Sequence, residues 1–551
     1  MPAAALKPPF FPIVYLRGFA ATDREIESTV ATPYMGFNLG STKIRQDHEG
    51  NIVRFIFESP LIRLMKDHDY LDVYRNGDFP KPDETVEPRS IWIFRYYEDE
   101  DQPGGGRRAS IPEFARELRE FILQIREQVC RDQPSVVRTA FRVYLVAHSM
   151  GGLIVRCYLQ NLCRNGWLDE RGRVDTEETA RLELSDRPVD ENGRVDDSVH
   201  LVEKVFTYGT PHGGIEMLGV APPDLGGLDR WHIRNFKPKN IQRYLGLSRK
   251  SDIRSLDGAF DPQRFFCFIG TNYRDYSAFF RMSKRVTGPT SDGLVMISNA
   301  AVQRAPRAFA HRSHSGPFGI VNSEEGYQNL RRFFFGEWRV DARLFADEIT
   351  LPLEIQREVD RGRKVEVSYH IEAALRVRGA AYFLHERRMA HASAVFARHT
   401  EWVNGDPEYL FSTCLLEAAR TKGNMAEDGA KQDEHRYLAF ALDLAIVRPM
   451  YEVERRFWFD DHFEGAPILA ETITFHVNPR APKRPLRYGL SSARPVGDTN
   501  REPAMQLVDD NRYEIDIPLG FEEIASNERK PKPGFRGRLR LTATRRRSPR
   551  S

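Results

Sequence analysis

The chain has 551 residues, too many for a single hydrophobic core, and this length predicts two domains. Hydrophobic residues make up 41% and charged residues 29% of the sequence, a composition typical of globular proteins, and no apolar run approaches the ~20 residues of a membrane span. The formal net charge of +3 is small for this length and gives no reason to expect a nucleic-acid partner.

The N-terminal sequence MPAAALKPPFFPIVYLRGF has no long apolar segment followed by a cleavage site. We therefore expect a cytoplasmic protein, or one exported without a recognisable secretory signal. The five cysteines are scattered and odd in number, which predicts buried thiols rather than a disulfide framework or a metal cluster.

Short apolar runs alternate with helical periodicity in the first part of the chain. This alternation predicts a mainly parallel sheet covered by helices on both faces, in a catalytic domain that spans residues 1–340. Strands are expected at 11–16, 90–97, 143–148, 202–208, 264–270 and 293–300, and helices at 111–129, after residue 149 and at 324–336.

Three stretches interrupt this rhythm, at about 35–78, 164–198 and 215–262. Long insertions above the edge of a catalytic sheet often form lids. We expect the third insertion, which contains Trp231, to form a lid or a wall for an acyl chain. Plain surface elaboration is the alternative for all three.

After about Trp338, polar and apolar residues alternate with a period of two, as in RYLAFALDLAIV and ILAETITFHV. This pattern predicts antiparallel strands in an accessory β-sandwich domain that spans residues 341–551. The segment 529–551 is basic and ends in RRRSPRS, so it is either a solvated tail or a peripheral contact with an anionic membrane.

The most informative motif is Val143-Tyr-Leu-Val-Ala-His-Ser-Met-Gly-Gly152, in which an apolar run leads to Ser149 and a helical segment follows. Such a strand, sharp turn and helix form a nucleophile elbow, in which the residues two before and two after the serine must be small. Ala147 and Gly151 meet that requirement. Met150 would start the helix and direct a backbone N–H towards an oxyanion.

An oxyanion hole needs a second backbone N–H, from the loop after an early strand. The strand at 11–16 runs into Arg17-Gly18-Phe19, so Phe19 is the expected second donor. Arg17 is a candidate for binding a phosphate or carboxylate group of a substrate.

A serine nucleophile also needs a base, and an acid that orients the base. Asp292, in the turn Thr290-Ser-Asp-Gly, is the expected acid, and His314, in a loop before the last helix, is the expected base. His311 lies three residues earlier and remains the alternative base. Ser149, Asp292 and His314 follow one another in the order of an α/β-hydrolase triad.

Two other histidines are expected to have structural roles near the site. His212, in GTPHGG, is expected to shape the floor of the substrate pocket, and His148 to pack beneath the elbow. His462 has acidic neighbours but lacks the ligand spacing of a metal site, so no metal is expected.

The motifs AHSMGG, TYGTPHGG, SDGLV and YLRGF together resemble the lipase branch of the α/β-hydrolase family, over about the first 340 residues. The resemblance implies an α/β-hydrolase fold and cleavage of lipid esters. Arg17 stands where those lipases usually have a histidine. Some lipases also carry a C-terminal β-sandwich that docks on lipid or on a partner.

We therefore expect a cofactor-free lipase or esterase that cleaves carboxylic esters through Ser149, His314 and Asp292. A phospholipase or acyltransferase with the same residues is the nearest alternative. A non-catalytic module that binds lipid or protein is the alternative from another class. The expected partners are an ester substrate and, through the basic tail, an anionic membrane, with no nucleic acid.

Overall fold

The computed structural model describes most of the chain between residues 6 and 546. The residues outside the description are 1–5, 19–33, 47–51, 75–77, 97–109, 133–134, 167–196, 216–234, 277–288, 364, 420–436, 454–466, 481–484, 493–499, 524–528, 532–533 and 547–551.

The chain divides into two compact units. The first comprises Met1–Arg307, Arg312–Leu330 and Ser548–Ser551, and the second comprises Ala308–His311 and Arg331–Arg547.

The first unit is built on six parallel strands in the order β4-β5-β1-β6-β7-β8. The seventh strand of this sheet, β9, belongs to the second unit except for its first residue. Continuous apolar runs produce these strands, and every residue of β1, β5, β6 and β8 is buried, as in a sheet covered on both faces. The strands are β1 (Ile13–Leu16), β4 (Leu71–Asp72), β5 (Ser90–Phe94), β6 (Val143–His148), β7 (Val202–Tyr208), β8 (Phe265–Gly270) and β9 (Arg307–Ala310).

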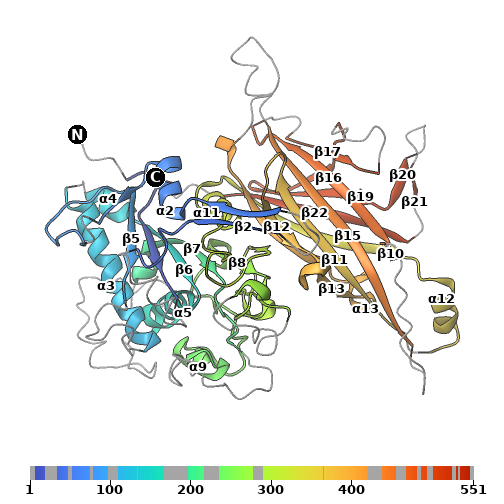
Figure 1. Ribbon diagram of the computed structural model, residues 1–551, viewed down its shortest axis with the longest axis horizontal. Coiled ribbons are helices and arrows are strands. Elements are labelled where there is room, and N and C mark those ends of the chain that lie inside the picture. The colour runs from blue at the N-terminus through green and yellow to red at the C-terminus, as the bar shows by residue number, and fades with distance from the viewer. Residues whose placement is uncertain are drawn as a thin grey trace, which may run out of the picture. The chain divides into compact units, whose positions relative to one another are not determined.

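Helices flank this sheet, and the unit has the expected α/β-hydrolase architecture (Figure 1). The longest is α3 (Ile111–Cys130), which begins with a capping box between Ser110 and Glu113 and buries one apolar side. It packs on α5 (Met150–Cys157), the helix that follows the elbow. The other α-helices among the described residues of the unit are α2 (Pro60–His68), α4 (Ser135–Ala140), α6 (Cys163–Asn165) and α9 (Pro238–Tyr244), and α11 (Glu324–Phe335) begins in it.

One strand expected from the sequence is absent. Residues 293–300 form turns and a single 3₁₀ turn at Ile297–Asn299 instead of a strand, because the Asp292 carboxylate accepts the N–H groups of Leu294 and Val295 that a ladder would use. The seventh strand is the four-residue β9, which the sequence reading did not identify.

The insertion at 35–78 is largely regular structure. It contains the hairpin of β2 (Ser41–Gln46) and β3 (Ile52–Phe57), followed by α2 and β4. Of the insertion at 164–198, residues 167–196 lie outside the described part of the chain. Residues 216–234 of the insertion at 215–262, which include Trp231, lie outside it as well, so the predicted lid stays a prediction.

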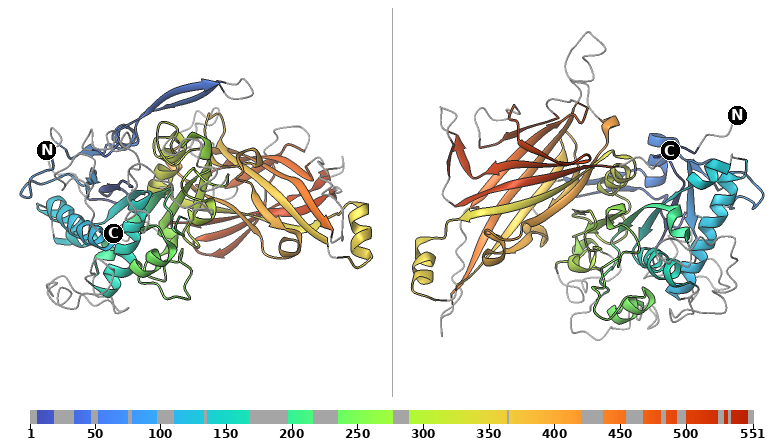
Figure 2. Two further views of the ribbon diagram at one scale, coloured as in Figure 1. Left: turned by 60° about the horizontal axis from the view of Figure 1, so that its bottom comes forward. Right: turned by 180° about the vertical axis from the view of Figure 1, so that it is seen from behind.

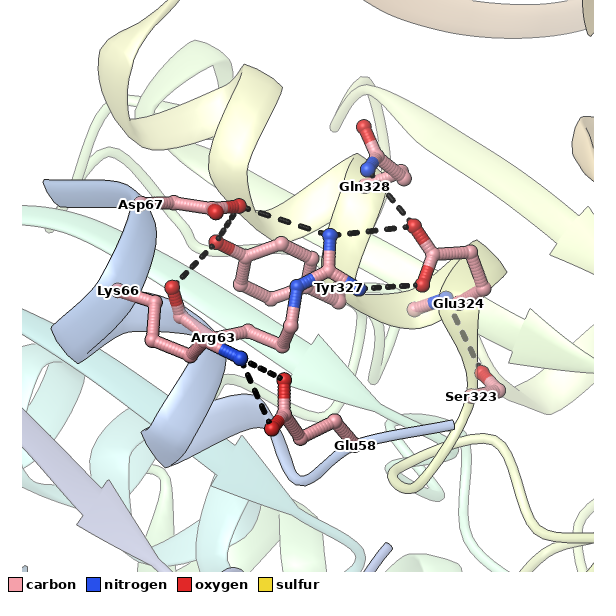
Figure 3. A network of polar contacts seen from close by, with 9 residues as sticks. Glu58, Arg63, Lys66, Asp67, Ser323, Glu324, Tyr327 and Gln328 are labelled. Atoms are coloured by element: carbon pink, nitrogen blue, oxygen red, sulfur yellow. Dashed lines mark hydrogen bonds and ion pairs between the residues drawn. The ribbon is translucent and has the colours of Figure 1, made fainter. Parts of the chain in front are cut away.

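A polar network joins α2 to the first turn of α11 (Figure 3). Arg63 of α2 forms an ion pair with Glu324, at 2.7 Å, and its guanidinium lies over the ring of Tyr327. The Tyr327 hydroxyl donates to Asp67 at 2.8 Å, and Gln328 donates to Glu324 at 2.8 Å. These contacts hold the start of α11, and with it the end of the loop that carries His314.

The second unit contains two antiparallel sheets that enclose a common apolar core, which confirms the expected β-sandwich (Figure 2). Alternate residues of each strand are buried, as the period-two pattern predicts. The five-stranded sheet has the order β14 (Glu408–Leu415), β10 (Trp338–Ile349), β22 (Phe535–Arg545), β19 (Arg512–Leu519) and β18 (Ala504–Asp509).

The other sheet has the order β12 (Phe383–Arg387), β11 (Val365–Val377), β15 (Leu438–Val453), β16 (Leu469–Val477) and β17 (Leu486–Leu490), and β13 (Val395–Arg398) pairs with β11. Two short helices, α12 (Leu353–Asp360) and α13 (His399–Trp402), and the hairpin of β20 (Phe521–Glu523) and β21 (Arg529–Pro531) complete the unit. None of the helices in the described part of the chain is long and apolar enough to span a bilayer.

Replacement of Gly151 by alanine should destabilise the protein. Alanine favours a helix over glycine by about 1 kcal/mol, yet a Cβ at this position in α5 would lie 2.8 Å from the backbone oxygen of Leu16 in β1. We expect this overpacking to prevail and the free energy of unfolding to fall by about 2 kcal/mol, as measured by urea denaturation.

The control for this variant is Gly258→Ala, where the added methyl group meets open space but the φ of +73° is unfavourable for alanine. Its free energy of unfolding should fall by about 1 kcal/mol from backbone strain alone. A Gly151→Ala protein as stable as the wild type would contradict the close approach of β1 and α5.

Candidate active site

Ser149 occupies a strained turn between β6 and α5. Its φ of 54° and ψ of −122° lie in a region that residues with a side chain rarely adopt. The neighbouring strand supports the turn, because the N–H of Ser149 donates to the carbonyl oxygen of Tyr208 at 2.9 Å. Strain that the surrounding structure maintains in this way is typical of functional sites.

The loop after β1 passes directly over this serine. A Cβ on Gly18 would lie 2.3 Å from the Cβ of Ser149 and 2.8 Å from the carbonyl oxygen of His148, so only glycine fits there. The next residue, Phe19, lies outside the described residues, and the position of its N–H stays a prediction. Met150 begins α5, so its N–H is one of the four that have no acceptor within the helix.

Three of the side chains singled out by the sequence form a chain of hydrogen bonds. His314 Nε2 lies 3.0 Å from Ser149 Oγ, and His314 Nδ1 lies 2.8 Å from Asp292 Oδ2. All three residues are nearly fully buried. An imidazole that contacts a hydroxyl on one side and a carboxylate on the other has the geometry of a general base and its orienting acid.

The two carboxylate oxygens of Asp292 have separate partners. Oδ2 faces His314, whereas Oδ1 accepts the N–H groups of Leu294 and Val295 at 3.0 and 2.8 Å. The backbone joins the same two loops, because the N–H of His314 donates to the carbonyl oxygen of Asp292 at 2.9 Å. The carboxylate is thus fixed in position relative to the imidazole by contacts on both sides.

Two glycines that were not predicted as part of the site make room for this pair. A Cβ on Gly209 would lie 2.9 Å from Asp292 Oδ2 and 3.1 Å from His314 Nδ1, and one on Gly270 would lie 2.8 Å from Asp292 Cβ. Each glycine comes at or directly after the end of a buried strand, β7 or β8. The sequence signal that could have identified these two residues is a glycine at the carboxyl end of a central strand.

His148 packs beneath the elbow, as expected, and it also contacts the loop of the candidate base. Its Nε2 lies 3.0 Å from the backbone oxygen of His314, and the two rings are 4.9 Å apart. Burial lowers the pKa of His148 well below 6.5, and His314 and Arg17 lower it further. The ring is therefore neutral, and Nε2 carries the proton that it donates to the carbonyl oxygen.

Arg17 is almost entirely buried, and its Nη1 donates to the carbonyl oxygen of Met35 at 3.2 Å. The carbonyl oxygen of Arg17 accepts the hydroxyl of Tyr96. These contacts give Arg17 a role in holding the loop that leads to Gly18, and its predicted contact with a substrate stays a prediction.

His212 is fully buried, with Nε2 3.3 Å from the hydroxyl of Thr207, and its carbonyl oxygen accepts a hydrogen bond from Arg156 at 3.0 Å. A side chain so enclosed stabilises the turn after β7 from within and is not accessible to a substrate. His311, the alternative base, stacks on His391 with ring centroids 3.5 Å apart, whereas the imidazole that meets Ser149 is that of His314.

In the part of the chain that the structure describes, no group of three or more histidine, cysteine, aspartate or glutamate side chains is arranged to hold a metal ion. All five cysteines are buried thiols. His462 lies outside the described residues.

No family model matches the sequence, and no curated protein matches it either. Among solved structures, the lipase BlEst2 from Bacillus licheniformis in its mature form is 15% identical, with a TM-score of 0.30, and the match covers 60% of this chain and 94% of that one. The phospholipase PlaB from Legionella pneumophila, in complex with thio-NAD, is 12% identical, with a TM-score of 0.30, over 83% of this chain and 91% of that one.

A cell surface hydrolase from Lactobacillus plantarum is 13% identical, with a TM-score of 0.22, over 64% of this chain and 98% of that one. Similarities this distant carry no information on what the present chain binds or converts. The reaction that the protein could catalyse therefore follows only from the residues of this chain.

The buried neutral histidines should make the protein less stable in mild acid. Burial lowers the pKa values of His148 and His212 well below 6.5, so below that pH the unfolded chain takes up protons that the folded protein does not. The free energy of unfolding should therefore fall between pH 6.5 and 5, by up to about 1.4 kcal/mol per pH unit for each histidine.

Urea denaturation at pH 7.5, 6.5 and 5.5 measures this slope. The variant His212→Gln keeps a polar side chain but removes one of these protonation sites, so its loss of stability between pH 6.5 and 5.5 should be smaller by about 1 kcal/mol. Equal slopes for the wild type and the variant would show that His212 is not held neutral by the fold.

Proposed function

We propose that the chain is a serine hydrolase that cleaves carboxylic ester bonds, with lipid esters as its substrates. The observation that carries the proposal is the continuous hydrogen-bonded path from Ser149 Oγ through His314 to Asp292 Oδ2. A serine hydroxyl is a weak nucleophile at neutral pH, and such a path is what activates it.

In the proposed mechanism, Ser149 Oγ attacks the ester carbonyl while His314 Nε2 takes its proton. The imidazolium that forms is stabilised by Asp292, and it then protonates the departing alcohol. Water next attacks the acyl-enzyme, again with His314 as the base, and the carboxylic acid leaves while Oγ regains its proton.

The oxyanion of each tetrahedral intermediate needs donors that are in place before the reaction. The N–H groups of Met150 and Phe19 are the proposed donors, and loss of one such donor typically costs about 3 kcal/mol of barrier stabilisation. The close approach of Gly18 to Ser149 supports this assignment, because it brings the loop that contains Phe19 to the nucleophile.

The lipid part of the proposal rests on the hairpin of β2 and β3, seen as the long blue strands in Figure 2. The strand register pairs Thr42 with Ile56, Ile44 with Arg54 and Gln46 with Ile52, so Ile44, Ile52 and Ile56 share one face. These isoleucines are 58%, 60% and 62% exposed. Exposed isoleucines beside an arginine suit contact with the surface of a lipid aggregate.

The assignment of the nucleophile and the base is tested by turnover of a soluble p-nitrophenyl ester. Ser149→Ala and His314→Ala should each reduce kcat by 10⁴-fold or more, and Asp292→Asn by roughly 10⁴-fold, because each removes a member of one hydrogen-bonded unit. His311→Ala is the matched control and should retain most of the activity. If His311→Ala abolished turnover while His314→Ala did not, the base would be His311.

The lipid assignment is tested with a panel of esters of rising acyl length beside phospholipid vesicles, which separates esterase, lipase and phospholipase activity. The combined variant Ile44→Ser, Ile52→Ser and Ile56→Ser should lose at least several-fold activity on emulsified or vesicular esters. It should keep its activity on monomeric p-nitrophenyl butyrate.

The control for this variant is Leu353→Ser, which removes a 77% exposed leucine of the second unit and should change neither activity. An equal loss of activity on soluble and aggregated substrates would mean that the three isoleucines stabilise the fold and do not contact lipid. If the variant lost no activity on either substrate, the hairpin would have no role in substrate recognition.

A further inference from the structure

The two sheets of the second unit enclose an apolar pocket. It has a volume of about 370 Å³ and is lined almost entirely by apolar side chains from both sheets. Phe411, Ile515 and Leu541 line it from the five-stranded sheet, and Leu442, Phe475 and Leu486 from the other. Its size lies at the lower end of the range of small-molecule sites in proteins, roughly 300–1,000 Å³.

The pocket opens towards one end of the sandwich. Along the inward face of β22, Leu539 is 0% and Leu541 8% exposed, Ala543 is partly exposed and Arg545 is exposed. The same gradient runs along β19, from Ile517 at 0% to the partly exposed Tyr513. The closed end is therefore the sandwich core, and Ala543, Tyr513 and Arg545 lie towards the mouth.

A space of this kind is unusual in the interior of a sandwich. Facing sheets normally fill the gap between them with interdigitated side chains, at the packing density of an organic crystal. Water would find few partners here, because a buried water needs two to four polar groups and the only lining side chains with polar atoms are those of Thr413, Tyr513 and Trp338. An apolar occupant would complete the packing.

The mouth carries positive charge. The guanidinium of Arg545 lies over the ring of Trp338, 6.0 Å from its centroid, and Trp338 itself lines the pocket. The guanidinium of the next residue, Arg546, instead donates to the backbone oxygen of Phe333 and lies over its ring. Arg480, next to the lining residue Pro479, already forms an ion pair with Glu417 at 2.7 Å.

We propose that this pocket binds the alkyl chain of an anionic amphiphile, with the chain between the two sheets and the head group at Arg545. The lining matches a flexible hydrocarbon chain, and the charge at the mouth matches a carboxylate or a phosphate. A free fatty acid and the acyl chain of an anionic phospholipid share this chemistry. The site lies wholly within the second unit and does not depend on the proposed reaction at Ser149.

Binding is tested with full-length protein that carries Ser149→Ala, so that hydrolysis cannot alter the ligand. A dansylated undecanoic acid should bind saturably to one site and show the blue-shifted emission of an apolar environment. Laurate should displace it. Displacement by lauroyl lysophosphatidylglycerol but not by laurate would assign the site to a phospholipid, and either result supports the proposal.

Two variants locate the site. Ala543→Phe places a large side chain in the pocket and should weaken laurate binding at least tenfold, whereas Thr542→Phe, on the opposite face of β22, should not change it. If Ala543→Phe fails to fold, Arg545→Gln decides the matter, because Arg545 is exposed. Arg545→Gln should weaken the binding of laurate several-fold and leave the binding of dodecanol unchanged. Arg536→Gln, on the same strand, is the control with the same change in charge.

The proposal is overturned if no saturable binding of the dansylated acid occurs. It is also overturned if binding persists unchanged in both Ala543→Phe and Arg545→Gln. Loss of binding in the Thr542→Phe and Arg536→Gln controls, to the same extent as in the test variants, would likewise contradict a site in this pocket.

Discussion

The polypeptide backbone approaches Ser149 and its partners so closely that side chains are excluded around them, and the rest of the candidate site depends on this constraint. Gly18 lies against the nucleophile, Gly151 lets α5 meet β1, and Gly209 and Gly270 leave room for Asp292 and His314. The same approach puts Ser149 at a φ of 54° and keeps its hydroxyl beside the imidazole. Close packing thus holds the Ser149 hydroxyl in the position that the proposed nucleophile requires.

Much of the first unit could be predicted because its strands are continuous apolar runs, and β6, β7 and α5 form where that pattern places them. The prediction was wrong at residues 293–300, whose apolar composition resembles a strand. There the Asp292 carboxylate accepts hydrogen bonds from the backbone N–H groups of Leu294 and Val295. Hydrophobic periodicity does not reveal this effect of a single side chain. The strand β9 was missed because its four residues, Arg-Ala-Phe-Ala, do not form the continuous apolar run that marks β1.

The site was predictable to the level of residue types and chain order, and less so in its supporting contacts. Sequence left His311 and His314 as alternatives because both belong to one short loop, and it is the tertiary structure that sets His314 between Ser149 and Asp292. In the second unit, alternation of polar and apolar residues predicted a sandwich. It could not predict the pocket, since the space between two sheets depends on how their side chains meet across the core.

The proposed activation of Ser149 can be measured by intact-mass spectrometry after treatment with a fluorophosphonate. One covalent adduct should form on the folded wild-type protein, and it should map to the peptide that contains Ser149. The adduct should be absent from Ser149→Ala and form far more slowly on His314→Ala. An unlabelled folded protein, or a Ser149→Ala variant labelled as fast as the wild type, would contradict it.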